Sequence, residues 1–141
     1  MNSGYLYIES LTQPEHAYHL AMSVDKPDSE RVQEGRKLVY IAKFRDIDAA
    51  FMHASGKLRH RCKHLDTVTF LTELTTMIAV IEADGLKHER IWLADVLDAK
   101  EMDALRTETE RLQKQAGNQD LIWKMVGIVA VVIFLLLSIA I

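Results

Sequence analysis

Residues 121–141 read LIWKMVGIVAVVIFLLLSIAI, and this stretch sets the architecture that we expect for the whole chain. No side chain from Met125 to Ile141 carries a charge, and Ser138 is the only polar one. A helix rises about 1.5 Å per residue, so these 21 residues span about 31 Å, close to the hydrocarbon thickness of a bilayer. The pattern predicts a transmembrane helix, and a buried core helix or core strand is the alternative.

The residues around this stretch predict how it sits in a membrane. Trp123 and Lys124 lie at its near end, and we expect them at the membrane interface, where aromatic rings and lysine ammonium groups prefer to be. Arg106, Arg111 and Lys114 precede the stretch, so the positive-inside rule puts the N-terminal side in the cytoplasm. A secretory signal opens with a basic segment followed by an apolar one, and this sequence does not open in that way. We expect a tail-anchored, single-pass protein of the bacterial inner membrane.

Composition fits a modest cytoplasmic domain in front of the anchor. The chain has 17 basic and 20 acidic side chains, a net charge of −3, which excludes a strongly basic nucleic-acid-binding protein. Cys62 is the single cysteine, so an internal disulfide framework is excluded and a reducing compartment is favoured.

Alternating apolar residues predict the first elements of that domain. GYLYIES (residues 4–10) is typical of a strand, and HLAMSV (19–24) of a second, shorter one. PDSERVQEGRKL (27–38) favours a helix, with proline near its start and an aspartate or serine available as its cap. VYIAKF (39–44) is rich in strand-forming residues and predicts a third strand.

The next segment alternates helices with a strand. Residues 46–64 predict a helix that opens on an aspartate and has one apolar face, formed by Ile47, Ala50, Phe51, Ala54 and Leu58. TVTFLTEL (67–74) predicts a strand that runs on into a helix over residues 75–84, which Gly85 ends. The order predicts an α+β fold: a small mixed sheet with flanking helices, followed by a helical stalk and one transmembrane helix.

The stalk is expected because the pattern from His88 to Asn118 changes to helix. Met102, Leu105 and Leu112 belong to a seam with steps of three and four residues, as in a short coiled coil. Two interpretations stay open: a stalk that packs on its own domain, or a self-association helix that uses these three residues. The expected domains are 1–86, a stalk over 87–120 and a membrane helix over 121–141.

One motif resembles a known family. GYLYIE (residues 4–9) is similar to the opening strand of the GIY-YIG nuclease superfamily, and most to its divergent branch in phage and bacterial proteins. The order that follows is similar too: a second strand, an arginine early in the next helix, a strand, a helix bearing a histidine (His53) and a last strand. The resemblance covers roughly residues 3–75. It implies a GIY-YIG-like cytoplasmic domain.

The resemblance also implies a site, but with important parts missing. In the family, tyrosines position water and phosphate, an arginine stabilises phosphate charge and a glutamate holds a divalent metal. Tyr5, Tyr7 and Arg31 would be the remnant of that catalytic site. The second-strand triplet, YIG- or KIG-like in the family, is HLA at residues 19–21, and no acid stands at residues 67–69, where the metal glutamate belongs. These departures predict a non-catalytic member without a bound metal.

Two functions follow from this comparison. The favoured one is a non-catalytic binding or scaffold module at the membrane, in an oligomer or a larger complex. Its expected partners are the lipid bilayer and a second copy or another membrane-associated protein, and no cofactor is expected. The alternative is a membrane-tethered, metal-dependent DNA endonuclease in defence or phage exclusion, for which nucleic acid is the partner and a divalent metal the cofactor. An acid beside the tyrosines would favour the nuclease.

A basic stretch, KLRHRCKH, is a second candidate contact surface. Its cations could touch nucleic-acid phosphates or anionic lipid headgroups, and the alternative is a solvated helix face; they are Lys57, Arg59, Arg61 and Lys63. His60 and His64 are four residues apart and would share a helix face, whereas Cys62 would not, so a metal site is not expected there.

Overall fold

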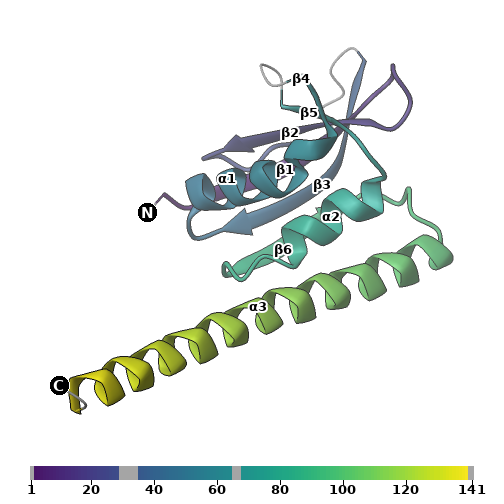
Figure 1. Ribbon diagram of the computed structural model, residues 1–141. Helices are drawn as coiled ribbons and strands as arrows, with labels where there is room; N and C mark the ends of the chain where they lie inside the picture. The colour runs from purple at the N-terminus through teal and green to yellow at the C-terminus, as the bar shows by residue number, and fades with distance from the viewer. Residues whose placement is uncertain (1, 29–34, 65–67, 140–141) are drawn as a thin grey trace.

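The computed structural model describes residues 2–28, 35–64 and 68–139. Within them the fold is α+β, as predicted, with a sheet in the order β4-β5-β2-β1-β3-β6 (Figure 1). The prediction of a mixed sheet is wrong, because every described strand pair is antiparallel. The strands are β1 Gly4–Leu11, β2 Ala17–Ser23, β3 Arg36–Phe44, β4 Cys62–His64, β5 Thr69–Leu71 and β6 His88–Leu93. The helices are α1 Ile47–Leu58, the short 3₁₀ helix η1 Arg59–Arg61, α2 Leu74–Glu82 and α3 Ala99–Ile139.

Alternation along β1 separates the two faces of the sheet. Leu6 and Ile8 are fully buried and belong to one core cluster with residues of α1 and α2. Tyr5 and Tyr7 alternate with them and therefore face the other side. Figure 1 shows α1 and α2 on the first face, and no described helix covers the second. We call the second one the open face.

Helix α1 forms as the sequence predicts. Asp46 caps it, and its carboxylate accepts a hydrogen bond from the Ala49 N–H at 3.1 Å. The predicted apolar face is confirmed, because Ile47, Ala50, Ala54 and Leu58 are buried and Phe51 packs against the core.

Gly4, at the start of β1, permits the close approach of β2, since a Cβ on Gly4 would lie 2.7 Å from the Ser23 carbonyl oxygen.

Two other helix predictions are wrong at their C-terminal ends. The prediction of a helix over residues 27–38 is wrong at its end, because β3 already begins at Arg36; residues 29–34 lie outside the described part. The helix predicted to reach residue 64 ends at Leu58 and continues as η1 and β4. In both places pairing with a neighbouring strand overrides local helix propensity. The predicted common helix face for His60 and His64 is therefore wrong.

The largest correction concerns residues 88–93, which were expected to be helical. They form β6, which pairs with β3 in the register Phe44↔His88 and Ile41↔Trp92. Without β6, the fully buried Ile41 and Tyr40 would lie on an edge strand. The sheet therefore continues past residue 86, where the domain was expected to end.

Helix α3 is one continuous element from Ala99 to Ile139. It begins with a reciprocal cap, in which the Glu101 N–H donates to Asp98 Oδ1 at 2.7 Å and the Asp98 N–H donates to Glu101 Oε2 at 2.9 Å. We call residues 99–119 its packed segment and residues 121–139 its apolar segment. In the packed segment Leu105 is 2% exposed and Leu112 packs against the core. This agrees with a stalk that packs on its own domain.

By length and composition α3 is a candidate membrane span, the one found among the described residues. None of its most apolar stretch is buried against the rest of the protein. A core helix of a soluble protein would be mostly buried, so the alternative of a buried core helix does not describe this segment.

Candidate functional site

The open face gathers polar side chains where β1 and β2 pair. Glu9 lies opposite His19 and Tyr7 lies opposite Ala21, and residues directly opposite each other point to the same side. Glu9 follows Tyr7 at a spacing of two, which keeps it on that side as well. The strand register thus brings Tyr7, Glu9 and His19 together.

These three residues border a cavity of about 150 Å³, which we call the polar hollow. Its lining is Tyr7, Glu9, His19, Pro27, Asp28, Arg36 and Leu38. Arg36, at the start of β3, points its Nη1 at Glu9 Oε2 at 3.4 Å. A β-bulge between Ile8 and Glu9 in the β1–β3 pairing sets this register. With two acids, one arginine and a histidine, the hollow has donors and acceptors but no large excess of either charge.

His19 adds a polar atom with an unused hydrogen-bonding capacity. Its Nδ1 is buried and has no hydrogen-bond partner among the described residues. An unpartnered buried nitrogen costs about 1–3 kcal/mol, which a ligand or ordered water that bonds to it would recover. Neutral imidazole presents either a donor or an acceptor at this nitrogen, so the group could bond to either kind of partner.

Of the residues in the nuclease resemblance, Tyr5 and Tyr7 share the open face, whereas His53 lies on the other side of the sheet. Tyr7 lines the polar hollow, but Tyr5 does not, and its ring lies 5.8 Å from the Lys43 ammonium. Arg31 lies outside the described residues. His53 is on α1, where its Nδ1 lies 3.1 Å from Asp84 Oδ2, on the helix-covered side of the sheet.

Sequence reasoning missed Glu9, Asp28 and Arg36. The sequence could have indicated Glu9, because Glu9 continues the spacing of two that starts at Tyr5 and Tyr7. Arg36 was missed because it was assigned to a helix. The position expected for a metal glutamate holds Thr69, which is 6% exposed and lies opposite His19. Among the described residues no group of three or more His, Cys, Asp or Glu side chains could hold a metal ion.

No family model matches the chain, and no curated protein or solved structure shows significant similarity to it. The nuclease resemblance therefore stays a prediction.

The basic stretch at the end of α1 does not form one surface. Lys57 Nζ lies 3.7 Å from Asp84, and Arg61 Nη1 donates to Thr72 Oγ1 at 2.6 Å. Arg59 is exposed in η1, and the side chain of Lys63 lies outside the described part. Lys57 is thus paired with an acid of the domain, whereas Arg61 bonds a neutral hydroxyl and keeps its charge.

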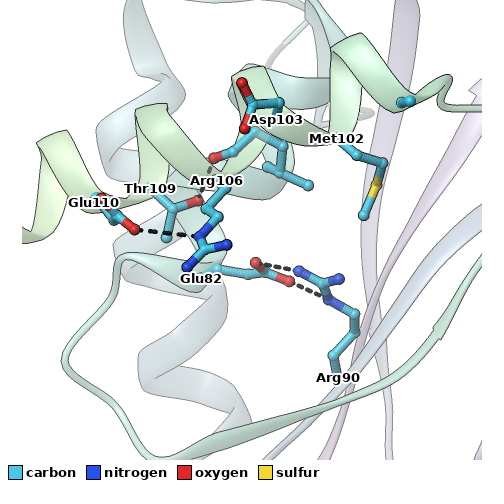
Figure 2. Close-up of a pocket in the computed structure, with 9 residues that line it drawn as sticks. Glu82, Arg90, Met102, Asp103, Arg106, Thr109 and Glu110 are labelled. Atoms are coloured by element: carbon cyan, nitrogen blue, oxygen red, sulfur yellow. Dashed lines mark hydrogen bonds and ion pairs between the residues drawn. The ribbon is translucent and has the colours of Figure 1, made fainter.

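The proposed self-association residues border or enter the domain's own core. Met102 lines a cavity of about 470 Å³ between α3 and the β6 side of the domain (Figure 2). Across that cavity Arg90 donates to both carboxylate oxygens of Glu82. Tyr40 donates to the same carboxylate at 3.3 Å, and burial, with the Glu82 charge, raises the pKa of Tyr40. Leu105 is buried against its own domain, so it is not a free contact surface.

Trp123 and Lys124 sit on α3 at the start of the apolar segment. Trp123 is 74% exposed, which is unusual for such a large apolar ring in water. Lys124 makes a contact within the chain. Their position along α3 is the one that interface residues of a membrane helix occupy.

Proposed function

We propose that this chain is a single-pass membrane protein whose α+β domain lies in the cytoplasm and acts as a non-catalytic binding module, in an oligomer or a larger complex. The continuity of α3 carries the proposal. The helix is fixed to the domain through Leu105 and continues as one helix into an apolar segment that the domain does not cover. A connection of this kind would hold the domain at the membrane surface.

The cytoplasmic placement rests on charge. Arg106, Arg111 and Lys124 precede the most apolar part of α3. Basic flanks remain on the cytoplasmic side during insertion. The domain that precedes the span would then be cytoplasmic.

Binding through the polar hollow is the role that its chemistry supports. Arg36, Tyr7, Glu9 and Asp28 give the hollow both donor and acceptor groups. Arg36 and Glu9 already pair with each other, and Tyr7 and Asp28 each interact within the chain, so a partner would share these groups. The mixed charges suit a polar loop or chain end of a protein partner better than a polyanion, which would meet two acids.

Fractionation of cells that express the full chain tests the membrane part. We expect the protein to stay in the membrane pellet after alkaline carbonate extraction. We also expect protease to digest the domain in inverted vesicles but not in intact spheroplasts. Release by carbonate, or digestion in intact spheroplasts, would contradict the proposal.

The membrane-tethered endonuclease remains a second candidate, and one observation favours it. The polar hollow contains an acid, Glu9, beside Tyr7 and His19, instead of a filled apolar pocket. However, Glu9 is engaged by Arg36, and the expected metal position holds Thr69. A divalent cation needs several oxygen ligands, so the nuclease is the less favoured candidate.

The two candidates differ in a direct assay. Purified full chain in detergent is incubated with plasmid DNA and Mg²⁺ or Mn²⁺, beside the variants Tyr7→Phe and Glu9→Gln. We expect no cleavage above that of a mock purification. Cleavage that depends on the metal and is lost in both variants would replace the binding module with the nuclease.

A further inference from the structure

The domain and the apolar segment are joined without a flexible linker. Gln119 still borders a cavity that it shares with Lys57 of α1 and with Ala83 at the end of α2. The apolar segment begins two residues later, at Leu121, which is about 3 Å further along a helix. If the apolar segment lies in a bilayer, the end of the domain beside it must lie at the headgroup region.

The end in question can be identified from the topology. Gln113 Nε2 donates to the Glu82 carbonyl at 3.5 Å, so α3 passes the C-terminal end of α2 on its way to the apolar segment. Figure 1 shows the α2–β6 turn and the end of β3 on the side toward which α3 continues. The β1–β2 turn, which contains Glu15, lies at the opposite end of the sheet.

This membrane-side end carries a cavity of about 600 Å³ that we call the basic hollow. Its lining is Ser3, Lys43, Phe44, Arg45, Lys87, His88 and Glu89. Lys43, Arg45 and Lys87 are exposed, and the last two form no ion pair with any described residue. Glu89 is the one acid of this lining and lies opposite Lys43 in the strand register.

The cations of the basic hollow are held by paired strands. The Arg45 N–H donates to the Lys87 carbonyl at 3.5 Å, and the rings of Phe44 and His88 stack with their centroids 5.0 Å apart. Outside the lining, Asp46 caps α1 and Asp48 accepts from the Asn2 amide at 3.4 Å. The lining itself, with three cations and one acid, is net positive.

We infer that the basic hollow binds the phosphate of an anionic phospholipid headgroup and docks the domain on the bilayer in one orientation. The inference rests on the proposed membrane function, because only a membrane-inserted α3 brings this end to the headgroups. Lysine and arginine near an anionic surface each favour contact about fivefold. Docking would also fix which way the polar hollow faces.

A depth measurement on the full chain in vesicles tests this inference. A fluorescent label is placed at Gly85→Cys, in the α2–β6 turn, with Cys62→Ser to remove the native thiol. Gly85 is exposed, and a Cβ there would meet no described atom within 4 Å. A second protein carries the label at Glu15→Cys, at the far end. The vesicles contain phosphatidylcholine alone or mixed with phosphatidylglycerol, with a headgroup-nitroxide lipid as quencher.

We expect strong quenching at position 85 in the anionic vesicles, weaker quenching in pure phosphatidylcholine, and little quenching at position 15 in either. Arg45→Glu with Lys87→Glu should shift the docking equilibrium at least about 25-fold, at about fivefold for each cation removed. Quenching at position 85 in the anionic vesicles should then fall to the level seen in pure phosphatidylcholine. Lys37→Glu with Lys100→Glu is the matched control, because these two exposed lysines line a cavity at the opposite end of the sheet.

The outcomes separate the two proposals. If alkaline carbonate releases the protein from the vesicles, the membrane function itself fails. If the protein is retained but position 85 is unquenched, or is quenched equally in both vesicle types and in the Arg45→Glu, Lys87→Glu variant, the docking inference is overturned. Equal loss in the control pair would likewise overturn it, since the effect would then reflect net charge alone.

Discussion

The packed and apolar segments of α3 belong to one helix but bury their side chains by different means. In the packed segment only a narrow stripe is apolar, and Leu105 is 2% exposed because the domain covers it. In the apolar segment Phe134 is 71% exposed and Leu136 is 63% exposed, although almost every side chain is apolar. A helix that is apolar on all sides needs an apolar solvent. The domain covers only the first segment, and under the proposed function a bilayer covers the second.

The largest expected effect comes from placing charge in the apolar segment. Val129→Arg with Ile133→Arg should cost about 3 kcal/mol for each arginine at the bilayer centre. We expect the protein to leave the membrane fraction in carbonate extraction, while circular dichroism of the purified chain in detergent keeps its folded signal.

A matched pair in the packed segment sharpens this prediction. Gln115→Arg with Asn118→Arg adds the same two charges at exposed positions. This variant should stay in the membrane pellet. If carbonate releases both double variants, or neither of them, the two segments do not differ in the solvent that they require.

The next effect concerns the packed segment alone. Leu105→Ala removes a fully buried side chain and should lower the free energy of unfolding of the domain by about 3 kcal/mol. Met102→Ala, one turn earlier and 38% exposed, should cost less than about 1 kcal/mol. Urea unfolding of both variants in mild detergent measures the difference.

The same variant separates the two interpretations of the seam. If Leu105 served self-association, Leu105→Ala would shift cross-linked species toward monomer and leave the unfolding transition unchanged. We expect the opposite result, because the leucine lies in its own domain's core. Membrane insertion should be unaffected in either case.

Sequence patterns predicted those elements whose signal is local. The spacing of two in β1, the aspartate cap and apolar face of α1, and the uninterrupted apolar segment of α3 are all set by neighbouring residues. The α+β class followed from them. These signals need no knowledge of what lies across the sheet.

The missed elements depend on partners far away in the sequence. β6 was assigned to a helix because HERIWL has no strong alternation, and its pairing with β3 decides its conformation. Arg36 reaches Glu9 only because β3 starts earlier than predicted and a bulge sets its register. The polar hollow therefore could not be assembled from the sequence, although Tyr7, a candidate from the sequence, lines it.

A smaller effect is expected at the start of the packed segment. Asp98→Ala removes one side of the reciprocal cap and leaves the Glu101 N–H without its acceptor, which should cost about 1 kcal/mol. Asp98→Asn keeps an oxygen at the cap and should cost less. The measurement is the urea midpoint of each variant. If both variants had the urea midpoint of the wild type, the cap would not stabilise α3.

The smallest expected effect is at an exposed ion pair of the packed segment. Arg106 Nε and Glu110 Oε1 lie 3.4 Å apart, four residues along the helix, with most of both side chains in water (Figure 2). Such pairs contribute about 0.3–0.5 kcal/mol, so Arg106→Gln should change the urea midpoint only slightly. The control is Arg106→Lys, which keeps the charge and should be closer to the wild type. If Arg106→Gln lowered the free energy of unfolding by more than about 1 kcal/mol, the contacts around the cavity beside Glu82 would hold this face of α3 more tightly than the exposure of Arg106 indicates. The packed segment would then depend on polar contacts as well as on Leu105, and its contrast with the apolar segment would be sharper still.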